Sequence, residues 1–169
     1  MMDVWRGAER LMGMDDAAWA RHASPASVWS RFTVLPLLAL AVYSRVWFGA
    51  WALVPIGLAL AWTWANPRLF AAPPRLDAWP TRAVLGERVF LVHRDRISAH
   101  HRRAAVLLTW ASLPGAAVLG WGLWALWPAW TAFGVVLTVL PKAWFCNRMA
   151  WLHDDWIAAG GAVPGRGAA

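Results

Sequence analysis

The stretch FTVLPLLALAVYSRVWFGAWALVPIGLALAWTWA, from Phe32 to Ala65, decides the fold, because Arg45 is its only charged residue. A single α-helix of this length would run to about 50 Å, whereas the hydrocarbon core of a bilayer is about 30 Å thick. The stretch must therefore turn back on itself and form two helices that each cross the apolar layer.

The turn is predicted at Arg45 and Gly49, with Trp47 and Trp51 beside them. An arginine reaches lipid headgroups, a glycine is flexible, and indole rings favour the membrane interface. Two spans follow, at about residues 25–44 and 48–65.

The ends of these two helices that lie away from the turn also carry helix start and stop signals. Ser24 can accept a hydrogen bond from the first free backbone N–H groups, and Pro25 fits the first helical position. At the other end, Pro67 disfavours helix at Asn66, so the second helix is predicted to stop there.

A second apolar pair follows at about residues 104–127 and 128–146, divided at Trp127 and Pro128. Lys142 lies near the end of the last span and can extend its amine to water. The sequence thus predicts an all-α integral membrane protein with four transmembrane helices in two hairpins. Residues 1–159 would form one membrane domain.

The overall composition agrees with this class. Hydrophobic residues make up 60% of the chain and charged residues 15%, with 16 tryptophans and a mean hydropathy of +0.42. The net charge of +7 comes almost wholly from arginine, and we expect no nucleic-acid partner. Cys146 is the only cysteine, which excludes an internal disulfide. We expect no cleaved signal peptide, since some thirty polar or amphipathic residues precede the first apolar run.

Loop charge predicts the orientation. The segment before Phe32 and the segment 66–103 hold nearly all the arginines, whereas the opposite side has Arg45 alone. By the positive-inside rule, both termini and the central loop 66–103 face the cytoplasm, in the inner membrane. Any polar site is therefore expected at the cytoplasmic helix ends.

The central loop is long enough to hold structure of its own. Thr81 to Val92 is predicted to form a short helix or strand lying on the membrane interface, with the helix favoured. After it, AHHRRA from Ala99 to Ala104 places His100 and His101 beside Arg102 and Arg103. Three interpretations stay open: a surface that contacts anionic headgroups, a specific phosphate site, and a metal site. Adjacent histidines are expected to diverge on a helix, and no metal-binding spacing is present, so we expect no metal or cofactor.

The two ends of the chain and the remaining polar residues are interpreted as follows. The first twenty residues resemble an amphipathic helix, and residues 160–169 are predicted to be disordered. Polar residues at the cytoplasmic level include His22, Asn66, Arg68, Arg148 and Asp154.

Several strings together resemble a family of small four-helix prokaryotic membrane proteins of unknown function: RHASPASVWSRF from Arg21, NPRLF from Asn66, VLGERVF from Val84, AHHRRA, and KAWFCNRMAWLHDD from Lys142. The resemblance implies the four-span topology. The chain departs from the family pattern at Ser24, Asn147 and His153. The matching polar residues are His22, Asn66, Arg68, Glu87, His100, His101, Arg148 and Asp154.

Two functions follow as hypotheses. The first is a multi-pass protein without enzymatic activity, whose basic cytoplasmic face engages anionic lipid headgroups or a partner protein, with a homo-oligomer or membrane partner also considered. The second is an enzyme acting on a lipid or lipid phosphate, with His100, His101 and Glu87 as candidate catalytic residues. In either case Arg68, Arg102, Arg103 and Arg148 would hold the anion. A transporter ranks third, because the predicted spans lack buried charges.

Overall fold

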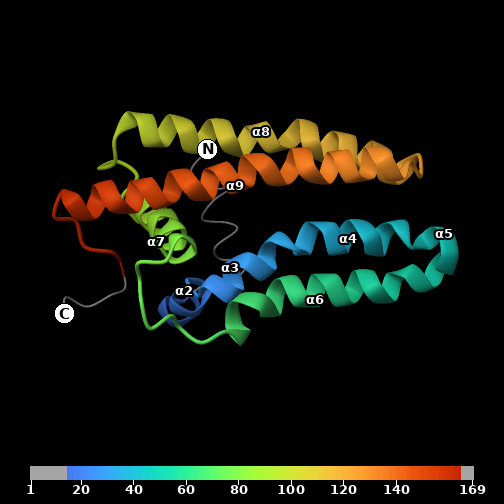
Figure 1. The fold of residues 1–169 in the computed structure, drawn as a ribbon, viewed down its shortest axis with the longest axis horizontal. Coiled ribbons are helices and arrows are strands. Elements are labelled where there is room, and N and C mark those ends of the chain that lie inside the picture. Colours follow the sequence, from blue (N-terminus) through green and yellow to red (C-terminus); the bar gives the residue numbers. More distant parts are fainter. Residues whose placement is uncertain (1–14, 165–169) are drawn as a thin grey trace.

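The computed structural model describes residues 15–164, and within that range the regular structure is entirely helical (Figure 1). The predicted amphipathic helix before Asp15 lies outside the described residues, as does the second half of the predicted disordered tail. The continuation of the N-terminal segment, α2 (Asp16–His22), is seen. Asp15 caps α2, since its side chain accepts from the backbone N–H of Ala18 at 2.6 Å.

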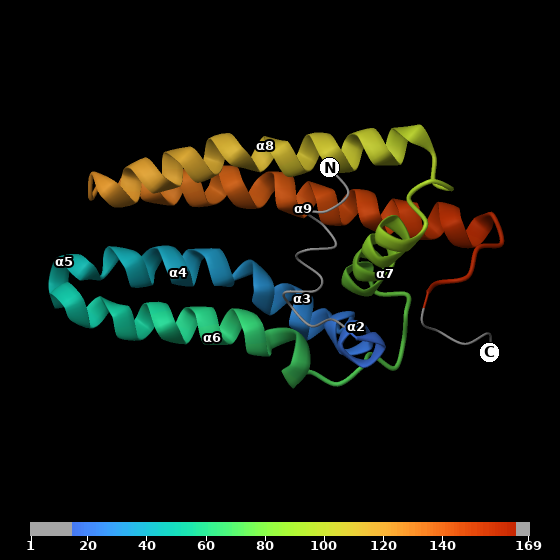
Figure 2. The same ribbon diagram turned by 180° about the vertical axis from the view of Figure 1, so that it is seen from behind.

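The first apolar stretch folds back as its length requires. The outgoing part is α3 (Pro25–Phe32) and α4 (Val34–Tyr43), and the returning part is α6 (Leu53–Leu69). Between them, α5 (Arg45–Phe48) and the 3₁₀ turn η1 (Gly49–Ala52) reverse the direction. Gly49 has a φ of 55°, which a glycine adopts without steric cost. Figures 1 and 2 show α4 and α6 side by side.

The turn lies at Arg45 and Gly49 as predicted, and Arg45 also contacts the second hairpin. Its guanidinium donates to the carbonyl of Leu123 at 2.5 Å, and the Tyr43 hydroxyl donates to the carbonyl of Leu126 at 2.9 Å. The Leu123 carbonyl lies in the last turn of α8, where the helix leaves it without an internal partner, and Leu126 follows two residues after the helix ends. Arg45 thus joins the turns of the two hairpins.

Two predicted helix signals are wrong in detail. Ser24 stands at the N-cap of α3, but its side chain forms no capping hydrogen bond. Pro67 does not end α6, which continues to Leu69. A proline this close to a helix end removes only one hydrogen bond, and Pro67 is packed beside Asn66, which is fully buried and held by serines of α3.

The second hairpin consists of α8 (Ala99–Trp124) and α9 (Pro128–Ala158), which lie side by side along their length (Figure 2). Glycines bring the two backbones together. A Cβ added to Gly115 would come within 2.5 Å of the Thr138 nitrogen, and one added to Gly134 within 2.3 Å of the Leu119 nitrogen. The structure begins α8 at Ala99, so AHHRRA forms its first turns.

The central loop contains α7 (Trp79–Val92), which confirms a helix in this segment. The predicted place on the membrane interface is wrong, however, because most of α7 is buried. Val89 and Phe90 pack with Phe145, Met149 and Leu152 of α9. The helix can come this close because Gly86 has no side chain: an added Cβ would lie 1.8 Å from the Met149 carbonyl oxygen.

The surface of the long helices is apolar. Large hydrophobic residues remain exposed along α4, α6, α8 and α9, including Leu40, Leu58, Leu107 and Phe133. Three helical stretches are long and apolar enough to cross a membrane: Pro25–Leu69, Ala99–Trp124 and Pro128–Ala158. Since exposed apolar surface on this scale is unfavourable in water, the three stretches mark a membrane protein.

Candidate functional site

The polar residues gather at one end of the molecule. In Figures 1 and 2, α2, α7, the start of α8 and the final turns of α9 lie at the same end, and the hairpin turns lie at the other. All the predicted site residues are at this polar end.

The first turns of α8 hold the two adjacent histidines. Their rings do not diverge as predicted, since the centroids of His100 and His101 are 4.3 Å apart. His100 turns toward Ser98, whose hydroxyl lies 3.3 Å from Nδ1, and it also accepts a hydrogen bond from Arg148. These two contacts hold the His100 ring across its neighbour.

His101 connects α8 to α9. Its Nε2 donates to the carboxylate of Asp155 at 2.8 Å, and the residue is only 2% exposed. Its Nδ1 is buried without a hydrogen-bond partner in the described part of the chain. Arg148, seven residues before Asp155, lies with its guanidinium 4.8 Å from the Trp151 ring centroid. This face of α9 therefore holds the start of α8 in place.

A second polar group lies between α2, α3 and α6. The Ser27 hydroxyl donates to Asn66 Oδ1 at 3.0 Å, and Asn66 Nδ2 donates to the Ser30 hydroxyl at 2.7 Å. The Arg31 guanidinium donates to His22 Nε2 at 2.8 Å. Ser27, Asn66 and His22 are all buried, so the group joins three helices inside the protein.

His22 is neutral in this setting. Burial, aided by the positive charges of Arg31 and Lys142, lowers the pKa of His22 from 6.5 to about 3. A neutral ring can accept at Nε2 from Arg31, with its own proton on Nδ1 toward the Ser27 hydroxyl, 3.5 Å away.

The remaining predicted residues lie on α6, α7 and α9. Glu87 is 3.9 Å from the Lys142 amine, and its charge also acts attractively on Arg31. Asp154 pairs with Arg82 at 2.6 Å. Arg68 lies over the Trp64 ring, 4.1 Å from its centroid. Glu87 thus contacts a different partner from the histidine pair of α8, which is held by Arg148 and Asp155.

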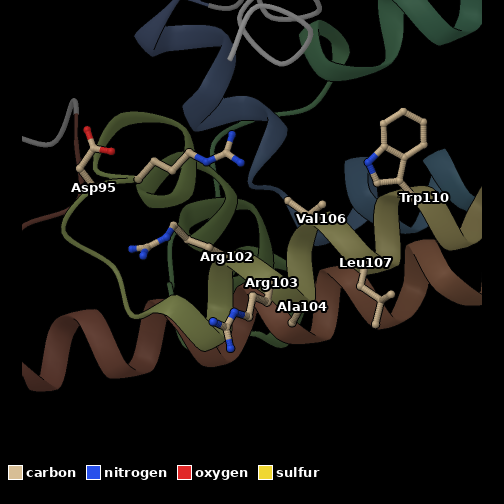
Figure 3. A pocket seen from close by; sticks show the side chains of 8 residues that line it. Asp95, Arg102, Arg103, Ala104, Val106, Leu107 and Trp110 are labelled. Atoms are coloured by element: carbon tan, nitrogen blue, oxygen red, sulfur yellow. The ribbon is translucent and has the colours of Figure 1, made fainter. Parts of the chain in front are cut away.

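A groove opens beside the start of α8, with a volume of about 810 Å³. Arg102 and Arg103 lie at one part of it, and Val106, Leu107 and Trp110 follow along the same helix (Figure 3). Arg94 and Asp95, from the connection between α7 and α8, complete the polar part.

Sequence reasoning missed several residues of these groups. Arg31 belongs to the arginines before Phe32, which the sequence marks only as loop charge, yet it contacts His22. Arg94 and Trp110 were not chosen as site residues, although both line the groove. The signal available for Trp110 was its spacing from Arg103: seven residues place the two on one face of a helix. The pairing of Arg88 with Asp16 had no such signal, because it depends on how α2 meets α7.

Among the described residues, no group of three histidine, cysteine, aspartate or glutamate side chains could hold a metal ion.

An all-helical chain with three membrane-length apolar stretches and one polar end defines a multi-helix membrane protein. The chain belongs to the family of unknown function DUF6653, which it matches over residues 6–169. No curated protein and no solved structure is detectably similar to it.

Proposed function

We propose that the protein crosses the inner membrane four times and that its arginine-rich cytoplasmic end binds anionic lipid headgroups. The four crossings would be α3 with α4, α6, α8 and α9. This topology is supported by the return of the first apolar stretch at α5 and η1, beside the α8–α9 turn. The positive-inside rule favours a cytoplasmic location for the opposite end, which carries the arginines.

One observation carries the lipid-binding function. Arg94, Arg96, Arg102 and Arg103 form no ion pair within the described residues, whereas Arg82 and Arg88 of α7 each pair with an aspartate. Within residues 15–164, their positive charge is thus not paired with a carboxylate at the point where α8 enters its apolar stretch. Each arginine near an anionic membrane surface contributes about 1 kcal/mol to binding.

The test measures which lipids the purified protein retains. The full chain in detergent is mixed with equal amounts of phosphatidylglycerol and phosphatidylcholine, and the co-purified lipids are quantified. We expect phosphatidylglycerol to be enriched, and the enrichment to fall several-fold when salt is raised from about 50 mM to about 500 mM, because ions screen exposed charges.

The matched variant replaces Arg94, Arg96 and Arg103 with glutamine and is expected to lose most of this enrichment. Arg102 is left intact, since it donates to the Ile97 carbonyl at 2.5 Å and supports the start of α8. Equal retention of the two lipids by the wild type, or enrichment indifferent to salt, would contradict the proposal.

A second candidate is an enzyme that acts on a lipid phosphate. One arrangement favours it. The exposed His100 is hydrogen-bonded to Arg148 and lies against the His101 ring. Asp155 in turn orients the His101 ring. His100 would exchange the proton and Arg148 would hold the anion. Loss of a cellular phenotype in a His100→Ala/His101→Ala variant that still folds would support this function, and a wild-type phenotype would remove it.

A further inference from the structure

The groove beside α8 combines two chemistries in one depression. Its polar part is formed by Arg94, Asp95, Arg102 and Arg103, and its apolar part by Ala104, Val106, Leu107 and Trp110 (Figure 3). A ligand that fills both parts must have an anionic group joined to an apolar one.

The charge of the polar part is unbalanced. Its lining holds three arginines and one aspartate, and neither Asp95 nor these arginines form ion pairs within the part of the chain that the structure describes. Arg102 is fixed by its bond to the Ile97 carbonyl at 2.5 Å, which leaves its other N–H groups available. A phosphate, with several acceptor oxygens, matches such a set of donors.

The apolar part follows the helix away from this charge. Arg103, Val106 or Leu107, and Trp110 are spaced along one face of α8, and seven residues correspond to about 10 Å along the axis. Leu107 is 69% exposed and Trp110 is 55% exposed, so neither is covered by the described protein. An acyl chain lying parallel to α8 would cover both side chains.

Asp95 narrows the choice of headgroup. An ionised carboxylate only accepts hydrogen bonds, so beside a phosphate it favours a headgroup that carries hydroxyl donors. A zwitterionic headgroup could place its ammonium on Asp95 and its phosphate on the arginines, but it brings no net negative charge to a lining that carries more arginines than carboxylates.

We propose that this groove binds one glycerophospholipid with a hydroxylated, anionic headgroup, of the phosphatidylglycerol type. The phosphate lies between Arg94, Arg102 and Arg103, the hydroxyls donate to Asp95, and one acyl chain lies on Leu107 and Trp110. This inference rests on the proposed function and adds to it a defined site that holds one lipid.

The test titrates the full chain in detergent with phosphatidylglycerol and counts bound lipids by native mass spectrometry. One tightly bound lipid is expected in the wild type. Arg103→Gln should weaken its binding about fivefold, as expected for one arginine near a lipid phosphate. Arg96→Gln is the matched control, because Arg96 is exposed and lies in the connection just before α8 but does not line the groove.

A second pair of variants tests the apolar part. Trp110→Ala should weaken binding several-fold, whereas Trp144→Ala should leave it unchanged. Trp144 is 62% exposed and, given the contact of Gly115 with Thr138, lies on α9 at a similar depth to Trp110. Equal losses in the two variants would overturn the site.

The headgroup is tested with phosphatidylmethanol, which has the same charge but no hydroxyl. The wild type should prefer phosphatidylglycerol, and Asp95→Ala should abolish the preference. Equal affinity in the wild type would overturn the role of Asp95, and displacement of the lipid by millimolar glycerol phosphate would overturn a membrane lipid as the occupant.

Equal weakening by Arg103→Gln and Arg96→Gln would reject the groove as the binding site but would leave the basic surface as the place where lipid binds. Equal binding of phosphatidylcholine would reject the proposed function itself.

Discussion

At the scale of single residues, several buried polar side chains are paired across helices. His22 of α2, Ser27 of α3 and Asn66 of α6 come from three elements, and each is buried. Since unpaired polar groups inside a protein are costly, such contacts fix how the helices meet.

The titration of His22 should make stability depend on pH. Its folded pKa of about 3 lies below the unfolded value of 6.5, so the unfolded chain takes up a proton that the folded protein does not. This contribution to stability is complete above about pH 6.5 and is lost as the pH falls toward 3, at about 1 kcal/mol per pH unit.

Thermal unfolding of the detergent-solubilised protein between pH 7 and pH 4 measures this effect. His22→Gln is the comparison, because glutamine can still accept from Arg31 but does not titrate in this range. The wild type should lose stability more steeply than the variant on acidification. Parallel curves would show that His22 is not buried as described.

The Asp155 carboxylate should matter for stability although its own side chain is 70% exposed. Asp155→Ala leaves the buried His101 ring without its hydrogen-bond partner, which should cost about 1–3 kcal/mol. Asp77→Ala is the matched control: its pair with Arg75 joins side chains that are 71% and 83% exposed, and such pairs contribute little. Equal unfolding temperatures for the two variants would argue against the His101 contact.

At the scale of elements, close backbone contacts set the packing of α7, α8 and α9. Gly134→Ala should destabilise the α8–α9 hairpin by about 1–3 kcal/mol, because its Cβ would meet the backbone of Leu119. Gly120→Ala, also in this hairpin, meets nothing within 4 Å and should be neutral or stabilising. Chemical or thermal unfolding in detergent distinguishes them. Equal stability of the two variants would contradict the close contact of Gly134 with the Leu119 backbone.

The helices could be predicted from the sequence wherever the composition and length of a segment are enough to determine its structure. The apolar stretch around Arg45 had to turn back because of its length, and α7 was expected because the central loop is too long to lack structure. The end of α6 was missed because Pro67 is held by packing around Asn66, which no local rule describes. The burial of α7 was missed for the same kind of reason, since it depends on Gly86 meeting α9.

At the scale of the whole molecule, loop charge alone located the polar end, because the arginines avoid the other turn almost completely. The contacts within that end could not be predicted. His101 with Asp155 and Arg31 with His22 are pairings between elements, and they depend on the register of helices that local sequence does not set. The groove could not be predicted either, because it forms only where the α7–α8 connection lies beside α8.

The most direct measurement of the central claim is the sidedness of the two hairpin turns. In a Cys146→Ala background, single cysteines replace Trp47 or Trp127 at the turns and Ala72 or Ala159 at the polar end, all of them exposed positions. A membrane-impermeant maleimide is applied to cells with a permeabilised outer barrier and to inverted membrane vesicles. Four crossings predict that the Trp47→Cys and Trp127→Cys variants react from outside, and that the Ala72→Cys and Ala159→Cys variants react only in inverted vesicles. Labelling of the two turns from opposite sides would contradict the account.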